Sequence, residues 1–121
     1  MSWITYGSVF KKGPLSESHL AEIDAVLASH ADELIRTRKG RVWRLSKRGV
    51  SFDIQVEPLD TVLWDCEDDV LETGLLPEVD DCRVQLTAPG RSDEVFEEIA
   101  RLLGLIATAI DGVHFGPRRC T

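Results

Sequence analysis

Apolar and polar side chains alternate without error from Val50 to Glu57. The apolar set and the polar set are Val50, Phe52, Ile54 and Val56 against Ser51, Asp53, Gln55 and Glu57. A period of two indicates a strand with one buried and one solvated face, which an antiparallel sheet allows. The segment Arg41–Ser46 precedes this strand, across a short turn at Lys47–Gly49. The sequence therefore predicts a β-hairpin over residues 41–57.

Two other segments carry apolar residues at helical spacing. Ser16 can cap a first helix that we expect to reach the basic residues before Gly40, with a stripe formed by Leu20, Ile23, Leu27, Ala31 and Leu34. Ser92 can cap a second helix that Gly112 can close, with a stripe formed by Phe96, Ile99, Leu102, Leu103, Ile106 and Ile110. We expect the following residues to be mostly buried together: Leu27, Leu34, Phe52, Ile54, Val84, Phe96, Ile99, Leu103 and Ile106.

Shorter stretches complete the chain as further strands. They are Trp3–Phe10, Thr61–Trp64, Cys82–Ala88 and Val113–Phe115, with a loose tail from Gly116 onward. Residues 70–79 are ambiguous and include a possible short helical turn. The sequence predicts one α+β domain over residues 1–121, an antiparallel sheet of about five or six strands with two helices packed on one face. The order β-α-β-β-β-β-α-β is loosely ferredoxin-like, a likeness of element order that carries no function.

Composition and cysteine usage are those of a soluble globular protein. Of the 121 residues, 43% are hydrophobic and 29% are charged. The segment Met1–Tyr6 has neither a basic leader nor an apolar run, and the longest uncharged apolar stretch, Leu102–Ile110, is about half of what spans a bilayer. Cys66, Cys82 and Cys120 are odd in number and share no close spacing, so neither disulfides nor a zinc site is expected. We expect a cytoplasmic protein with no membrane partner.

Charge is divided between two adjacent stretches. Residues 36–48 carry seven of the fourteen basic residues and no acid, whereas residues 49–82 contain no Lys or Arg. Within the second stretch, residues 53–81 hold eleven of the twenty-one carboxylates. Blocks of one sign determine which partners a protein attracts or repels. The two stretches are therefore candidate interaction surfaces.

The densest part of the acidic stretch is the candidate binding site. It consists of one aromatic residue and five carboxylates: Trp64, Asp65, Glu67, Asp68, Asp69 and Glu72. These carboxylates could gather Ca²⁺ or Mg²⁺, but the stretch lacks the glycine that an EF-hand loop has at its sixth position, so we expect a solvated loop and no metal. Crowded carboxylates repel one another, and a basic protein partner would relieve this repulsion. Trp64 is either an aromatic anchor for such a partner or a core-facing strand residue.

The basic stretch has two interpretations. The hairpin combines an aromatic ring with cations, as in a nucleic-acid-binding ribbon: Trp43 with Arg41, Arg44, Lys47 and Arg48. Alternatively, Asp53 and Glu57 on the returning strand neutralise Arg44 and its neighbours across the hairpin. The net charge of −7 opposes general nucleic-acid binding. We therefore expect intramolecular charge pairing and no nucleic-acid partner.

No catalytic constellation can be assigned from the sequence. His19 and His30 lie about 16 Å apart along the expected helix, too far to share a metal, and His114 stands on a separate strand. The glycines are dispersed and form no phosphate-binding loop. We expect no catalytic residue, metal or cofactor, and an enzyme is unsupported rather than excluded.

Three functional hypotheses follow. The leading one is a non-enzymatic binding protein that presents the acidic surface of residues 57–81 to a basic protein, for example a bacterial immunity protein or antitoxin that covers the cationic active site of a toxin. The second is a homo-oligomeric domain whose exposed sheet face or edge pairs with itself. The third is a small-molecule binder or enzyme with a cleft between sheet and helices. A co-purified basic protein, self-association or a retained metabolite would distinguish the three.

Overall fold

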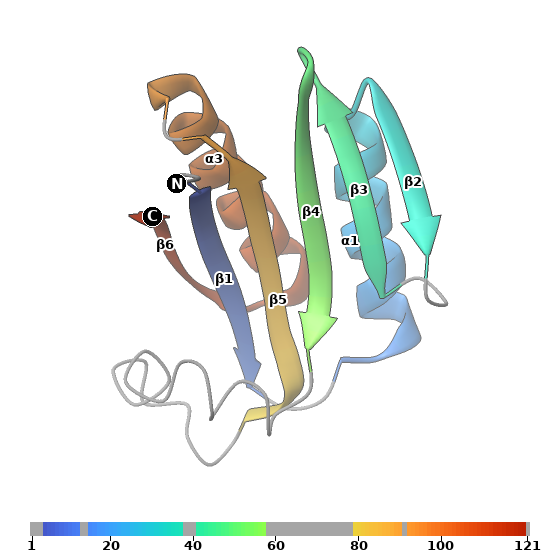
Figure 1. Cartoon of the computed structure of the whole chain (residues 1–121). Helices are drawn as coiled ribbons and strands as arrows, with labels where there is room; N and C mark the ends of the chain where they lie inside the picture. The colour runs from blue at the N-terminus through green and yellow to red at the C-terminus, as the bar shows by residue number, and fades with distance from the viewer. Residues whose placement is uncertain (1–3, 13–14, 38–40, 58–78, 91, 121) are drawn as a thin grey trace.

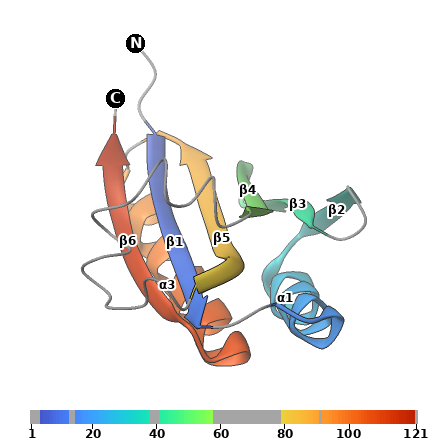
Figure 2. The ribbon, with the colours of Figure 1, turned by 90° about the horizontal axis from the view of Figure 1, so that it is seen from below.

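The fold is an antiparallel sheet with helices on one face, in a computed structural model that describes residues 4–12, 15–37, 41–57, 79–90 and 92–120. Six strands in these residues form one sheet, in the spatial order β2-β3-β4-β5-β1-β6. The helices α1 and α3 cover the same face of the sheet (Figures 1 and 2). The elements in chain order are β1 (Ile4–Lys12), α1 (Glu17–His30), β2 (Glu33–Thr37), β3 (Val42–Lys47), β4 (Val50–Glu57), β5 (Val79–Pro89), α3 (Asp93–Ile110) and β6 (Val113–Cys120).

The predicted fold class and element order are confirmed. The described elements follow the order β-α-β-β-β-β-α-β in an α+β fold. The predicted strand Cys82–Ala88 corresponds to β5, which begins earlier, at Val79. The predicted strand Thr61–Trp64 and most of the ambiguous segment 70–79 lie outside the described residues. The strand that completes the order is instead β2, which the sequence analysis assigned to the first helix.

The first helix is shorter than predicted. Its cap residue Ala31 already has extended backbone (φ −95°, ψ 144°), and β2 begins two residues later. Leu34, which the helical stripe included, lies opposite Leu45 of β3 and is partly buried. Pairing with β3 satisfies backbone hydrogen bonds along one side of this segment, which is why it is a strand. The prediction that the basic residues before Gly40 end this helix is therefore wrong.

Serine caps begin both helices, as predicted. Ser16 Oγ accepts a hydrogen bond from the backbone N–H of His19, and the backbone N–H of Ser16 donates to Nδ1 of His19 over 3.1 Å. This reciprocal pair is a capping box that satisfies two backbone donors at once. Ser92 Oγ accepts from a backbone N–H in the first turn of α3 over 3.2 Å. Both helix starts were therefore readable from the sequence.

The end of α3 differs from the prediction by one residue. Asp111, not Gly112, adopts the left-handed conformation that closes the helix (φ 56°, ψ 50°). Aspartate tolerates this conformation better than most residues because its side chain is short and polar. Gly112 is required by packing instead, because a Cβ there would lie 2.8 Å from both the carbonyl oxygen of Phe10 and Cγ1 of Val9.

The predicted hairpin is formed by β3 and β4. Its two-residue turn has positive φ at both Arg48 (51°) and Gly49 (78°). A type I′ turn requires this, and its twist matches the twist of the flanking strands. Across the hairpin, Arg44 lies opposite Asp53, and the two side chains form a salt bridge of 2.9 Å. This pair confirms the predicted cross-strand neutralisation at Arg44. Glu57, the other acid considered, lies beyond the residues of β4 that pair with β3.

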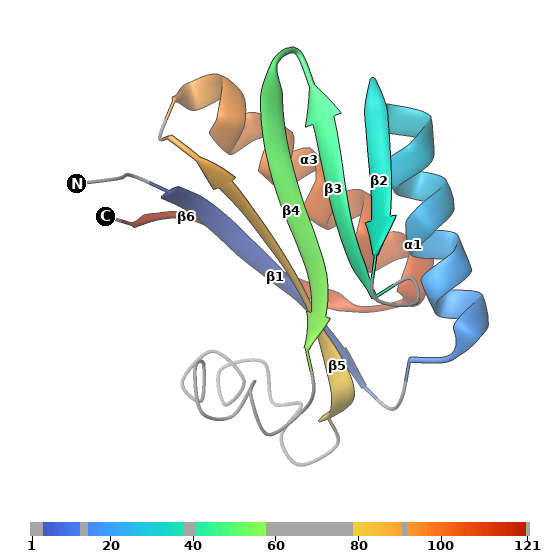
Figure 3. The same cartoon turned by 45° about the vertical axis from the view of Figure 1, so that its right-hand side comes forward.

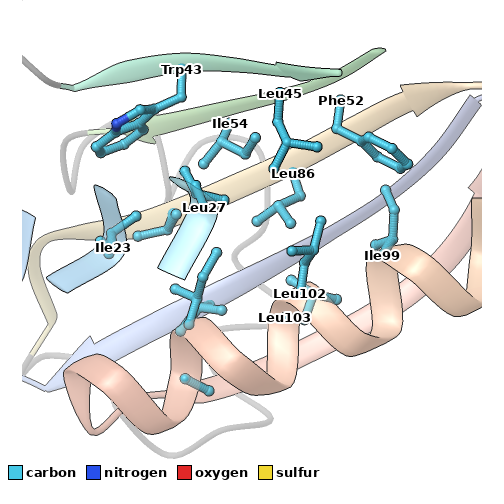
Figure 4. Close-up of a cluster of buried hydrophobic side chains, with 14 of the residues drawn as sticks. Ile23, Leu27, Trp43, Leu45, Phe52, Ile54, Leu86, Ile99, Leu102 and Leu103 are labelled. Atoms are coloured by element: carbon cyan, nitrogen blue, oxygen red, sulfur yellow. The ribbon is translucent and has the colours of Figure 1, made fainter. Parts of the chain in front are cut away.

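The main core lies between the sheet and the two helices. Figure 4 shows side chains of β3, β4 and β5 facing those of α1 and α3: Trp43, Leu45, Phe52, Ile54 and Leu86 against Ile23, Leu27, Ile99, Leu102 and Leu103. Seven of the nine residues expected in the core are buried: Leu27, Phe52, Ile54, Val84, Ile99, Leu103 and Ile106. The other two, Leu34 and Phe96, are partly buried. The apolar periods therefore identified the core face of the strands and of both helices.

A smaller buried cluster lies on the opposite face of the sheet. Phe10 is fully buried, and it follows Val9, which belongs to the main core. Because adjacent residues of a strand point to opposite faces, Phe10 points away from the helices. Its ring packs edge-on against Phe115 of β6, with the centroids 5.7 Å apart. Arg83, opposite Phe10 in register, is only 1% exposed. Because β6 continues past Gly116 and pairs with β1, the loose tail predicted there is wrong.

Candidate functional site

The predicted acidic site lies in the connection between β4 and β5. Its residues are outside the described ones: Trp64, Asp65, Glu67, Asp68, Asp69 and Glu72. The structure does show where this connection leaves the sheet and returns to it. The strands β4 and β5 are adjacent and antiparallel, β4 ends at Glu57 and β5 begins at Val79. Both points lie at the end of the sheet opposite to the hairpin turn (Figure 1). Residues 58–78 are called the acidic connection below.

The basic stretch is paired with carboxylates from three different elements. Arg36 of β2 binds Asp24 of α1, and Arg44 of β3 binds Asp53 of β4. Lys47 of β3 binds Glu98 of α3, over 2.9 Å. These three carboxylates all lie outside the acidic connection. Three of the seven cations of the basic stretch are therefore engaged within the folded domain.

Asp24 receives hydrogen bonds from two strands. Its Oδ2 accepts from Nη2 of Arg36 over 3.0 Å, and its Oδ1 accepts from Nε of Arg36 and from the indole Nε1 of Trp43. The hydrogen bond from Arg36 is the main reason that the pKa of Asp24 is lowered, against the opposing effect of desolvation, and the bond from Trp43 adds to it. The same pair raises the pKa of Arg36. Because Trp43 is 1% exposed, the aromatic ring of the basic stretch belongs to the core and offers no stacking surface.

Glu98 joins two cations beside the hairpin turn. Its Oε1 accepts a hydrogen bond from Nζ of Lys47 over 2.9 Å, and its Oε2 accepts from Nη2 of Arg101 over 2.7 Å. Burial acts to raise the pKa of Glu98, but the hydrogen bonds from Lys47 and Arg101 outweigh it, so the pKa is lowered. The side chains of Lys47 and Glu98 are 18% and 19% exposed. This ion pair is therefore partly shielded from water and from screening by salt.

A small hollow lies beside this pair, between the tip of the hairpin and the first turn of α3. Its walls include Val50 and Phe52 of β4 and the cap residue Ser92. The hollow has a volume of about 70 Å³. Small-molecule sites usually measure about 300–1,000 Å³. The hollow between sheet and helices is thus too small for a ligand of ordinary metabolite size.

The face of the sheet opposite the helices, called the helix-free face below, carries the buried Phe10–Phe115 contact at β1 and β6 and the exposed Arg44–Asp53 pair at β3 and β4. Shallow hollows of about 340 and 240 Å³ lie on either side of the exposed Arg44–Asp53 pair. Two exposed apolar side chains line them, Ile4 (37% exposed) and Ile35 (48% exposed). Ile35 is not among the residues predicted from the sequence to form a site, because the apolar period extends the first helix over it, although β-branched Ile35 and Thr37 favour a strand.

The described residues contain no constellation with an evident chemical role. In the part of the chain that the structure describes, no group of three or more His, Cys, Asp or Glu side chains could hold a metal ion. His19 is used in the cap of α1, His30 is the last residue of that helix, and His114 lies exposed on β6. The helices of the described residues include none that is long and apolar enough to cross a membrane.

Comparisons with known proteins gave no match. Neither the protein-family models, nor the curated proteins, nor the solved structures contain one that matches this chain. The function therefore has to be argued from the charges and the geometry of the chain itself.

Proposed function

We propose that this is a non-enzymatic cytoplasmic binding protein whose acidic connection docks a basic protein. An immunity protein or antitoxin, which neutralises a toxin by covering its cationic active site, is a concrete member of this class. The proposal is carried by one observation: residues 58–78 contain seven carboxylates and no Lys or Arg. Trp64 beside Asp65 adds an aromatic side chain of the kind that interface hot spots favour.

The charge pairing elsewhere in the domain supports this proposal. Three cations of the basic stretch have salt-bridge partners outside the acidic connection: Arg36, Arg44 and Lys47. The Lys47–Glu98 pair is the most shielded of these, and removing one partner from a shielded ion pair is unfavourable. These three cations therefore have ion-pair partners within the domain, and we propose that the field of the connection acts on a cationic protein.

The flanking strands determine where the connection leaves and rejoins the sheet. Because β4 and β5 are adjacent strands, residues 58–78 leave and rejoin the sheet at the same end. The helix-free face, with the exposed Arg44–Asp53 pair, can contribute polar contacts at the rim of such an interface.

Association kinetics test the proposal. The test variant combines Asp65→Asn, Glu67→Gln, Asp68→Asn and Asp69→Asn. The matched control neutralises the same number of exposed carboxylates elsewhere, by Glu22→Gln, Glu33→Gln, Glu97→Gln and Asp111→Asn. Both variants change the net charge equally, so any difference between them depends on where the charges lie. Rates are measured at two salt concentrations against a basic protein co-purified from the native cell.

We expect salt to slow the association of the wild type and of the control, while dissociation changes much less. The test variant should associate about tenfold more slowly at low salt, and its rate should depend less on salt. Equal association rates for all three proteins at both salt concentrations would overturn the proposal. Self-association that persists or strengthens in the test variant would favour the homo-oligomer instead, and a retained metabolite would favour a small-molecule binder.

A further inference from the structure

We draw no further inference here: the strongest candidate, the outer edge of β2 (Figure 3) with the exposed Ile35 at its centre, carries none, because nothing in the described residues shows what covers it.

Discussion

The indole Nε1 of Trp43 donates a hydrogen bond to Oδ1 of Asp24 over 3.0 Å, and this bond joins the buried face of β3 to α1. The same carboxylate binds Arg36 of β2. One side chain thus connects three elements, and it gives a 1% exposed tryptophan the acceptor that a buried indole N–H needs. The same carboxylate also holds α1 beside the edge strand β2.

Asp24→Asn should lower the free energy of unfolding by about 1–2 kcal/mol, measured by chemical denaturation. The substitution removes the charge that binds Arg36 but keeps an acceptor for Trp43. Asp24→Ala should have a larger effect, because it leaves the indole N–H without this acceptor. Asp53→Asn is the control, since the Arg44–Asp53 side chains are 60% and 50% exposed and an exposed pair contributes about 0–1 kcal/mol. Equal losses for Asp24→Asn and Asp53→Asn would contradict the prediction.

Stability should decline in acid as Asp24 and Glu98 become protonated. The hydrogen bond from Arg36 lowers the pKa of Asp24 below its ordinary value of 3.8. Burial opposes the shift at Glu98, but Lys47 and Arg101 hold its pKa below the ordinary value of 4.5. A lowered pKa in the folded state means that the unfolded state binds more protons in this range, so the free energy of unfolding rises with pH.

The contribution of both carboxylates is therefore complete above about pH 4.5, and it is lost as the pH falls through their folded pKa values. Denaturant unfolding measured in steps from about pH 6 to about pH 3 should show this decline. The double variant Asp24→Asn, Glu98→Gln should be less stable at neutral pH and should decline less steeply in acid. A decline as steep as that of the wild type would show that other carboxylates cause it.

The hairpin and the core could be predicted because their signals are local. Each apolar residue from Val50 to Val56 faces the helices, and a period of two has no helical counterpart over that length. The apolar stripe from Phe96 to Ile110 likewise fits only a helix. Ser92 then marked the beginning of α3, because a side-chain acceptor there satisfies a backbone N–H that the helix leaves free.

The strand β2 could not be predicted by the same rules because distant contacts determine it. Leu34 continues the helical stripe of α1, but it also fits an inward position of a strand. Asp32, just after the helix, is hydrogen-bonded to the β3–β4 hairpin instead of continuing the helix. Its backbone N–H donates to the carbonyl of Ser46, and its carboxylate accepts from the N–H of Arg48, both over 2.9 Å. A window of local sequence contains neither partner.

Only the local features of the candidate site could be predicted from the sequence. The charge split is visible in the sequence, and the Arg44–Asp53 pair follows from the register of the hairpin. The partner of Lys47 could not be found in that way, because Glu98 is 51 residues away and α3 brings it there by packing. The role of the acidic connection, outside the described residues, stays a prediction.

Replacing Ile54 or Leu103 by alanine should lower the free energy of unfolding by about 2–5 kcal/mol, through lost burial and a residual cavity. Both side chains are fully buried, one on β4 and the other on α3 (Figure 4). Val113→Ala is the control, because a half-exposed side chain at a sheet edge should change stability by about 0.5 kcal/mol or less. Unfolding midpoints like that of the wild type for both core variants would mean that these side chains do not pack as described.

Gly7 and Gly104 should respond to alanine in opposite directions. Gly7 of β1 faces α3, and a Cβ there would collide with Cδ1 of Leu103 and lie 3.0 Å from the carbonyl oxygen of Phe115. Gly7→Ala should therefore destabilise the protein by about 1–3 kcal/mol, as overpacking of a filled core does. Gly104 lies next to Leu103 within α3, and a Cβ there meets nothing within 4 Å. Gly104→Ala should stabilise the protein by about 0.5–1 kcal/mol, because alanine loses less backbone entropy in a helix.

A double-mutant cycle can establish that Leu103 is the cause of the Gly7→Ala effect. Leu103→Ala removes the methyl group that the new Cβ would meet, so the two changes share a site and should not be additive. In the Leu103→Ala background, Gly7→Ala should destabilise by clearly less than in the wild type, or fill part of the cavity and stabilise. Gly104→Ala, whose Cβ contacts nothing, should have the same effect in both backgrounds. If Gly7→Ala had an equal effect in both, the close approach of β1 to Leu103 would not be what requires a glycine at this position, and the carbonyl of Phe115 would be the remaining cause.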